Sequence, residues 1–273
     1  MTEIREPAVA GYFYPADAAA LGQTIEQMLG AARTTGAEAP KALIVPHAGY
    51  VYSGPIAASA YARLRPYRDR YHRVVLLGPC HRVAVDGLAL SGADSFRTPL
   101  GDVPLDKSAI SNLHLPQLTV FDATHEFEHS LEVHLPFLQS VLGEFTLVPI
   151  LVGSASHGAV AEVLDALWDG PDTLIVISSD LTHYLSYDAA RATDNETRRS
   201  IEALDAGSIG HDDACGATPI GGLLLAARRR GLAVETLDLR NSGDTAGDRR
   251  RVVGYGAWAF TEPAGTWRVQ RSH

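Results

Sequence analysis

Short apolar runs alternate along this chain with longer segments of helix-forming composition, and this alternation limits the available folds more than any other feature. Helix-length segments such as "HGAVAEVLDALW" (157–168) and "IGGLLLAARRRG" (220–231) separate the runs. Strands joined through such crossovers pair in parallel. The sequence therefore predicts an α/β fold with a mostly parallel central sheet flanked by helices. The runs are "KALIV" (41–45), "RVVLL" (73–77), "FTLVPILVG" (145–153), "TLIVISS" (173–179), "AVETLDL" (233–239) and "VVGYGAWAF" (252–260).

The chain has 273 residues and contains neither a repeat nor a low-complexity segment that would mark a linker. This length suits one large α/β domain. We expect the domain to cover residues 1–262 and a C-terminal tail to follow at 263–273.

Composition disfavours several classes of protein. Apolar residues make up 46% of the chain, yet no apolar run approaches the roughly 18 residues of a membrane span. A formal net charge of −9 disfavours a nucleic-acid-binding surface. The first residues, "MTEIREPAVAG", lack the basic and apolar regions of a secretory signal, and Cys80 and Cys215 alone form no disulfide framework. We therefore expect a cytoplasmic protein without membrane or nucleic-acid partners.

Polar side chains follow three of the apolar runs at the point where each run ends. His47 comes directly after "LIVP", His81 follows "VVLLGPC", and "LIVISS" leads into Asp180 and His183. Ligands of open α/β sheets bind beyond the carboxyl ends of parallel strands. Three strands that bring histidine to the same edge would form a site, so we interpret these residues as a functional cluster.

A separate histidine-rich segment, "HEFEHSLEVHLPFL" (125–138), begins with a literal HExxH match between His125 and His129. In zinc proteases this pattern places two metal-binding histidines on one helix face, with the glutamate as base. Here Glu132 stands where the extended protease motif has glycine, so we rank a zinc hydrolase low. Both His129 and His134 could reach the cluster if the segment crosses its mouth as a loop followed by a short helix.

The ordered motifs of the chain resemble those of the Memo family, the Memo-like component of the AmmeMemoRadiSam system of bacteria and archaea. They extend from residue 5 to residue 260, and their order over that length is far more specific than any one of them. The motifs are "PAVAGYFYP", "VPHAGYVYSGPIAASAY", "LLGPCHRV", "FRTPLGDVPLD", "EHSLEVHLPFLQ", "VPILVG", "SSDLTHY", "CGATPIGGLL" and "NSGDTAGDRRRVVGYGAWAF".

The resemblance implies a fold similar to class III extradiol dioxygenases of the LigB type, which use non-haem Fe(II). It also implies a metal-capable site that uses His47 and His81, with His183 close by. Fe(II) is the metal expected from this resemblance, and copper and zinc are alternatives.

The third metal ligand is where the chain departs from the family pattern. Eukaryotic Memo proteins carry a cysteine before the last strand, and an ungapped comparison anchored on Tyr255 places Thr245 at that position. Threonine is a poor ligand, whereas the neighbouring Asp244 would complete a two-histidine, one-carboxylate face suited to Fe(II). Asp248 is a second candidate. The surrounding "NSGDTAGD" reads equally well as a Gly/Asp-rich turn.

If His47, His81 and Asp244 hold iron, other residues acquire roles by position. We expect His183 or His129 to move the proton that oxygen activation requires, with His134 as a further candidate. Asp180 would orient His183. The expected substrate-binding residues are Tyr50, Tyr52, Ser53 and Cys215. Cys215 opens a predicted helix and reads alternatively as a small buried residue.

Three classes of function remain open from the sequence. The first is a metal-dependent oxidoreductase of unknown substrate, related to extradiol dioxygenases. The second is a non-catalytic binding protein whose pocket takes a small molecule, a peptide or a partner protein of the AmmeMemoRadiSam system. A zinc hydrolase at the HExxH match ranks third.

Overall fold

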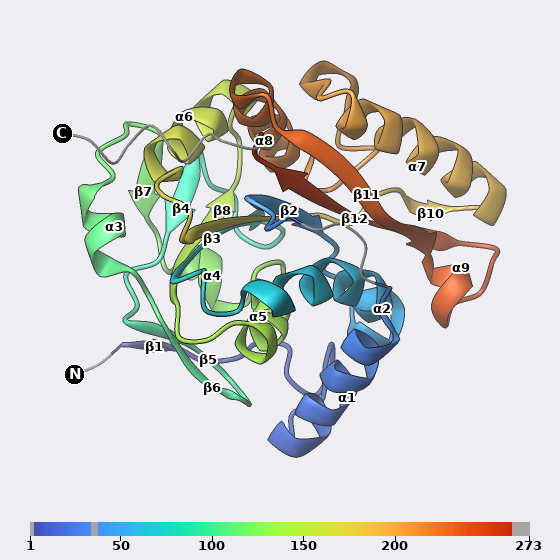
Figure 1. Cartoon of the computed structure of the whole chain (residues 1–273), viewed down its shortest axis with the longest axis horizontal. Coiled ribbons are helices and arrows are strands. Elements are labelled where there is room, and N and C mark those ends of the chain that lie inside the picture. The colour runs from blue at the N-terminus through green and yellow to red at the C-terminus, as the bar shows by residue number, and fades with distance from the viewer. Residues whose placement is uncertain (1–2, 34–37, 264–273) are drawn as a thin grey trace.

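A computed structural model describes residues 3–33 and 38–263 and shows a twisted sheet covered by helices (Figure 1). Within these residues nine strands form one sheet in the order β10-β12-β2-β9-β3-β8-β4-β7, with β11 paired to β12. Their bounds are β2 (Ala42–Val45), β3 (Arg73–Pro79), β4 (Leu88–Leu90), β7 (Leu118–Val120), β8 (Thr146–Val152), β9 (Thr173–Ser178), β10 (His183–Leu185), β11 (Ala233–Asn241) and β12 (Val252–Thr261).

The centre of the sheet is parallel, and antiparallel pairings join the flanking strands to it. The neighbouring strands β2, β9, β3 and β8 all pair in parallel. In contrast, β12 runs antiparallel to β2 and β11, and β4 runs antiparallel to β8. The predicted α/β class with a helix-flanked sheet is confirmed, and the sheet as a whole is mixed. The consecutive strands β11 and β12 need no helical crossover, which permits their antiparallel pairing.

The central strands are buried on both faces, which explains their unbroken apolar runs. In β3, Val74 and Leu76 join one hydrophobic core, whereas Val75 and Leu77 join the other. Successive side chains of a strand point to opposite faces, so only a run without polar interruptions can serve two cores.

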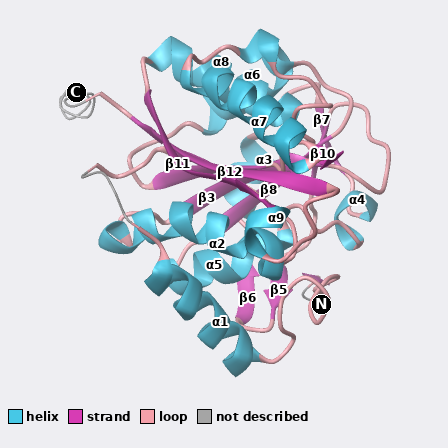
Figure 2. Ribbon diagram, turned by 90° about the vertical axis from the view of Figure 1, so that its right-hand side faces the viewer, coloured by secondary structure: helices cyan, strands magenta, loops and turns pink. Residues whose placement is uncertain are grey.

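Two layers of helices cover these two cores (Figure 2). On one face α1 (Ala18–Ala31), α2 (Tyr50–Tyr61) and α5 (Leu135–Val141) pack together. On the other face lie α6 (His157–Leu167) and α8 (Ala217–Arg230), while α7 (Tyr187–Glu202) packs on β11 and β12. The shorter helical elements are α3 (Lys107–Asn112), α4 (Ala123–Glu126), α9 (Ser242–Thr245), η1 (Ala62–Tyr67), η2 (Glu132–His134) and η3 (Ala206–Ser208).

A small second sheet brings the N-terminus close to the middle of the chain. It consists of β1 (Ile4–Arg5), β5 (Ser95–Thr98) and β6 (Gly101–Pro104), in the order β1-β5-β6. This sheet could not be predicted from the sequence, because strands of two to four residues carry too little periodicity to be recognised.

The described residues contain no helix that is both long and apolar enough to span a membrane. The tail predicted at 263–273 lies outside the described residues except for Pro263, so its boundary stays a prediction.

Candidate metal centre

His47 and His81 lie side by side at the carboxyl edge of the parallel strands. His47 follows β2 and His81 follows β3, while β9, which ends at Ser178, runs between these two strands. The ring centroids of the two histidines are 5.3 Å apart. The edge that the sequence indicated therefore does gather these side chains.

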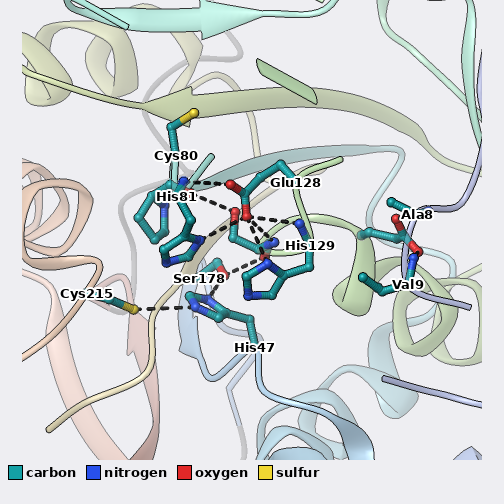
Figure 3. A network of polar contacts seen from close by, with 12 residues as sticks. Ala8, Val9, His47, Cys80, His81, Glu128, His129, Ser178 and Cys215 are labelled. Atoms are coloured by element: carbon teal, nitrogen blue, oxygen red, sulfur yellow. Dashed lines mark hydrogen bonds and ion pairs between the residues drawn. The ribbon is translucent and has the colours of Figure 1, made fainter. Parts of the chain in front are cut away.

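His129 joins this pair from the loop between α4 and η2 (Figure 3). Its ring stacks on His81 with a centroid distance of 4.9 Å and meets the His47 ring edge-on at 5.4 Å. One ligand nitrogen from each of the three rings lies within 4.8 Å of the other two. The side chain of His47 is 2% exposed, that of His129 18% and that of His81 31%, so the group opens to solvent on the His81 side.

Ser178 determines which nitrogen of His47 is free. The hydroxyl of Ser178 donates its only hydrogen to the carbonyl oxygen of Ser130 at 2.6 Å. The same oxygen lies 2.6 Å from Nδ1 of His47, so it must accept a hydrogen from that nitrogen. We assign the proton of His47 to Nδ1, which leaves the lone pair of Nε2 available to a metal.

The buried carboxylate of Glu128 performs the same function for His81. Its Oε1 lies 2.9 Å from Nδ1 of His81, and its Oε2 accepts the His81 amide at 2.6 Å. Oε1 also accepts the amide hydrogens of His129 and Ser130, at 2.9 and 3.0 Å. A carboxylate behind a ligating imidazole fixes the ring and leaves Nε2 free, as in many metal sites.

The charges of the group suit metal binding. Burial alone would raise the pKa of Glu128, but the hydrogen bonds from His81 and nearby amides outweigh it and lower the pKa to about 2. Burial lowers the pKa of His129 to about 4 and that of His47 well below its usual value. Neutral imidazoles keep the lone pair that a metal needs, and the ionised carboxylate beside them favours a cation.

One buried nitrogen of the group has no partner. Nδ1 of His129 is buried without a hydrogen bond, although Oε1 of Glu128 lies 3.2 Å away in a direction unsuited to one. Nε2 of His47 lies 3.4 Å from the weakly polar Sγ of Cys215. Buried polar groups are normally hydrogen-bonded, so a buried imidazole nitrogen without a partner is suited to a metal ion. The residues present therefore fit a metal ion held by histidine nitrogens.

Asp180 and Cys215 adjoin His47 without joining the group of three histidines. Oδ1 of Asp180 accepts the His47 amide at 2.8 Å, and Oδ2 lies 4.0 Å from Nε2. Burial raises the pKa of Asp180 to about 7 and, with Asp180 nearby, that of the Cys215 thiol to about 12. Cys215 is thus a protonated thiol, and Asp180 contacts His47 rather than the expected His183.

The structure does not place Asp244 with the histidines. Its carboxylate accepts the Asn241 amide at 3.0 Å, in a capping box that begins the short helix α9. The other oxygen accepts the hydroxyl of Tyr187 at 2.6 Å. Asp248 is likewise engaged, with the side chain and amide of Arg250.

The two halves of the HExxH match point to different places. α4 ends at Glu126, so His125 and His129 do not share one helix. Nε2 of His125 lies 3.2 Å from the carbonyl oxygen of Ala89, in the core. The zinc-protease geometry is therefore not formed.

Of the remaining predicted residues, some are buried and some line the solvent side. His134 is 1% exposed and contacts the Tyr61 hydroxyl through Nδ1 at 2.8 Å. Tyr50 is also buried, with its hydroxyl donating to the carbonyl oxygen of Val133. The predicted residue Ser53 is buried and donates to the carbonyl oxygen of Ala48.

Tyr52 and His183 remain accessible. Tyr52 is 41% exposed, and His183 packs edge-on against the ring of Tyr184 at 5.9 Å. Tyr184 has a left-handed backbone (φ 61°), a strained conformation for a side chain of this size. Of the expected substrate-binding residues Tyr50, Tyr52 and Ser53, only Tyr52 is exposed.

The sequence indicated no role for Glu128 in the site, and it suggested His129 as a metal ligand only within the HExxH match, together with His125. Glu128 was part of the HExxH-containing segment, and its bonds to His81 cross a long stretch of chain. The available signal was that Glu128 directly precedes His129 in a histidine-rich segment.

Comparison with known proteins places the whole chain in one family. The model of the Memo-like protein family matches residues 5–259. A MEMO1 family protein of Methanosarcina barkeri is 36% identical over 271 residues, covering 93% of this chain and 98% of that protein. One of Aeropyrum pernix is 38% identical over 284 residues, covering 93% and 99%. One of Aquifex aeolicus is 35% identical over 267 residues, covering 92% and 97%. The predicted family is confirmed, and the chain belongs to the Memo family.

Proposed function

We propose that this protein is a metal-dependent oxidoreductase of the extradiol dioxygenase type, with Fe(II) held by His47, His81 and His129. The observation that carries the proposal is the meeting of three imidazoles whose ligand nitrogens lie within 4.8 Å of one another. His129 takes the position that the sequence analysis gave to Asp244. Imidazole also suits copper and zinc, so the identity of the metal is part of the test.

Fe(II) at this position would supply the one-electron chemistry that lets O2 react with an electron-rich, bidentate substrate such as a catechol. The group of three histidines has one side enclosed by the protein and one side open to solvent. His47 is enclosed, whereas His81 and His129 keep 31% and 18% of their side chains exposed. A substrate would therefore approach from the His81 side.

The proposed proton acceptor for a catechol hydroxyl is His183. It lies in β10, and burial lowers its pKa, so the ring is neutral near pH 7 and able to take a proton. Asp180 holds the amide of His47 and is a second group able to exchange a proton near neutral pH. Tyr52, exposed near the strand ends, would contact the substrate ring.

Metal binding by anaerobically purified protein tests the proposal. Fe(II), Cu(I) and Zn(II) affinities are measured by competition for the wild type and for His47→Ala, His81→Ala and His129→Ala. His211→Ala, at an exposed histidine outside the group, is the matched control. We expect one ion per chain in the wild type and the control, and its loss in the three variants.

Oxygen consumption with a panel of catechols then tests the reaction class. Uptake of O2 that needs the three histidines, with a ring-opened product by mass spectrometry, supports a dioxygenase. A wild type that binds none of the three ions contradicts the proposal. Metal binding without O2 uptake contradicts the oxidoreductase and leaves a metal-containing pocket for a peptide or for a protein of the AmmeMemoRadiSam system.

A further inference from the structure

The loop that carries Glu128 and His129 is not shaped by regular secondary structure. α4 ends at Glu126 and η2 begins at Glu132, and residues 127–131 between them form neither helix nor strand. Glu128 and His129 nevertheless need a fixed geometry, because one orients His81 and the other belongs to the histidine group. Contacts from elsewhere in the chain must supply it.

Arg5 supplies three of these contacts. Its Nε donates to the carbonyl oxygen of His125 at 2.9 Å, and its Nη2 donates to that of Glu128 at 2.6 Å. Its Nη1 forms an ion pair with Glu132. Arg5 is only 8% exposed. The planar, forked guanidinium thus holds α4, the loop and the start of η2 at once, which a single ammonium group cannot do.

Glu132 fastens the loop to the N-terminal segment from the other side. Its carboxylate has no exposed surface and accepts the amides of Ala8 at 2.7 Å and Val9 at 3.0 Å. It also accepts the hydroxyl of Tyr14 at 2.5 Å. Loss of either charge would leave the other buried and unpaired, so Arg5 and Glu132 depend on each other.

The same N-terminal segment reaches the ligand side of the group. The ring of Phe13 packs against His129 with a centroid distance of 4.9 Å. The carbonyl oxygen of Phe13 accepts the amide of Tyr50 at 2.8 Å, at the start of α2 just beyond His47. Residues 5–14, which we call the N-terminal strap, therefore contact the chain around two of the three histidines.

From these contacts we infer that the N-terminal strap is part of the metal centre, with Arg5 and Glu132 as positioning residues. Arg5 fixes the backbone of Glu128, whose side chain fixes His81 and the amide of His129. The expected effect on metal affinity rests on the proposed function. The geometry that Arg5 and Glu132 hold does not depend on a bound metal.

Two readouts test it, one with metal and one without. Fe(II) and Zn(II) dissociation constants are measured for Arg5→Ala, Arg5→Lys and Glu132→Gln. The ring nitrogens of His81 and His129 are also followed by 15N NMR in the metal-free protein. Arg63→Ala and Arg63→Lys are the matched controls, because Arg63 is equally buried and pairs with Glu235, away from the loop.

We expect Arg5→Ala to weaken metal binding about tenfold to a hundredfold, as removal of outer contacts of a metal site does. The metal affinity of Arg5→Lys should lie between those of Arg5→Ala and the wild type. Both Arg5 variants should shift the ring-nitrogen signals of His81. The Arg63 variants should lose stability without either change. If Arg5→Ala does not fold, Arg5→Lys and Glu132→Gln carry the comparison.

Arg5 variants that match the Arg63 variants in both readouts would overturn the inference. A wild type without metal affinity would sink the proposed function alone. The NMR comparison would then still decide the role of Arg5: unchanged signals in Arg5→Lys refute it, and shifted signals with silent controls support it.

Discussion

Glu128 and His81 are joined twice, since one carboxylate oxygen accepts the His81 amide at 2.6 Å and the other lies 2.9 Å from its ring Nδ1. The backbone and the ring of His81 are thus oriented by one buried group. A ring held in this way has a single tautomer and one direction for its free nitrogen.

Replacing Glu128 by Gln should weaken metal binding about tenfold to a hundredfold, because the amide nitrogen would face N–H donors and the carboxylate charge would be lost. Competition titration with Fe(II) or Zn(II) measures the change. Glu126→Gln, at an exposed neighbour, should bind like the wild type. Equal affinities of Glu128→Gln and the wild type would contradict the role given to this carboxylate.

Ser178→Ala should release the tautomer of His47. Without the hydroxyl, Nδ1 loses its acceptor, so the proton can move to Nε2 and compete with a metal. We expect a changed 15N pattern for His47 and a weaker metal affinity. The control Ser140→Ala removes a hydroxyl that bonds only to the Pro136 carbonyl in α5 and should change neither. A His47 ring that keeps its pattern in Ser178→Ala would refute the assignment.

Asp244→Ala tests whether Asp244, the ligand expected from the sequence, or His129, the proposed ligand, completes the metal site. The structure gives this carboxylate to the capping box of α9 and to Tyr187, so the variant should lose about 0.5–2 kcal/mol of unfolding free energy. Its metal affinity should equal that of the wild type. Loss of bound metal with unchanged stability would restore Asp244 as a ligand and remove His129 from that position.

Asp194→Asn should change how stability depends on pH. Burial raises the pKa of Asp194 to about 6, above the roughly 3.9 of an unfolded chain. Between these values the folded protein binds more protons, so the contribution of Asp194 to stability is lost as the pH rises from 4 to 6. Asp194→Asn has no carboxyl to ionise. Its free energy of unfolding, relative to that of the wild type, should therefore rise by about 2–3 kcal/mol between pH 4 and pH 7.

Urea unfolding at pH 4, 5, 6 and 7 measures this difference. Asp188→Asn, at an exposed position of the same helix, serves as the control. Parallel pH profiles for the wild type and Asp194→Asn would show that the buried carboxyl titrates normally.

Gly78→Ala should disturb the layer beneath the histidines. A Cβ at Gly78 would lie 2.9 Å from Leu131 Cδ2 and 3.1 Å from both Ser130 Oγ and Ser178 Cβ. Overpacking of this kind costs about 1–3 kcal/mol. Because Ser130 and Ser178 set the tautomer of His47, metal affinity should fall as well. Gly22→Ala, with open space around it in α1, should be neutral or stabilising.

The sequence predicted the sheet edge well and the third histidine poorly, for one physical reason. The strands β2, β3 and β9 are buried on both faces, so their apolar runs are unbroken and the position of the following residue is fixed by the sheet. His129 follows no strand. Its place depends on a loop whose shape is set by Arg5 and Glu128, through contacts between residues more than a hundred positions apart.

The local partners of Asp244 could not be read from the sequence, and its role as a metal ligand stays a prediction. An Asn–x–x–Asp pattern can form a capping box as readily as it can offer a carboxylate, and the segment "NSGDTAGD" forms the box. The two helix-length segments named from the sequence, in contrast, coincide with most of α6 and α8.

The three histidines lie on three separate connections of the chain, after β2, after β3 and after α4. Their nitrogens meet only when the tertiary structure is complete, so an ion held there distinguishes the native protein from every partly unfolded form. Such selective binding stabilises the native state by about 2.7 kcal/mol when the free ion is at a hundred times its dissociation constant. The lifetime of the protein against proteolysis would then follow the supply of its metal.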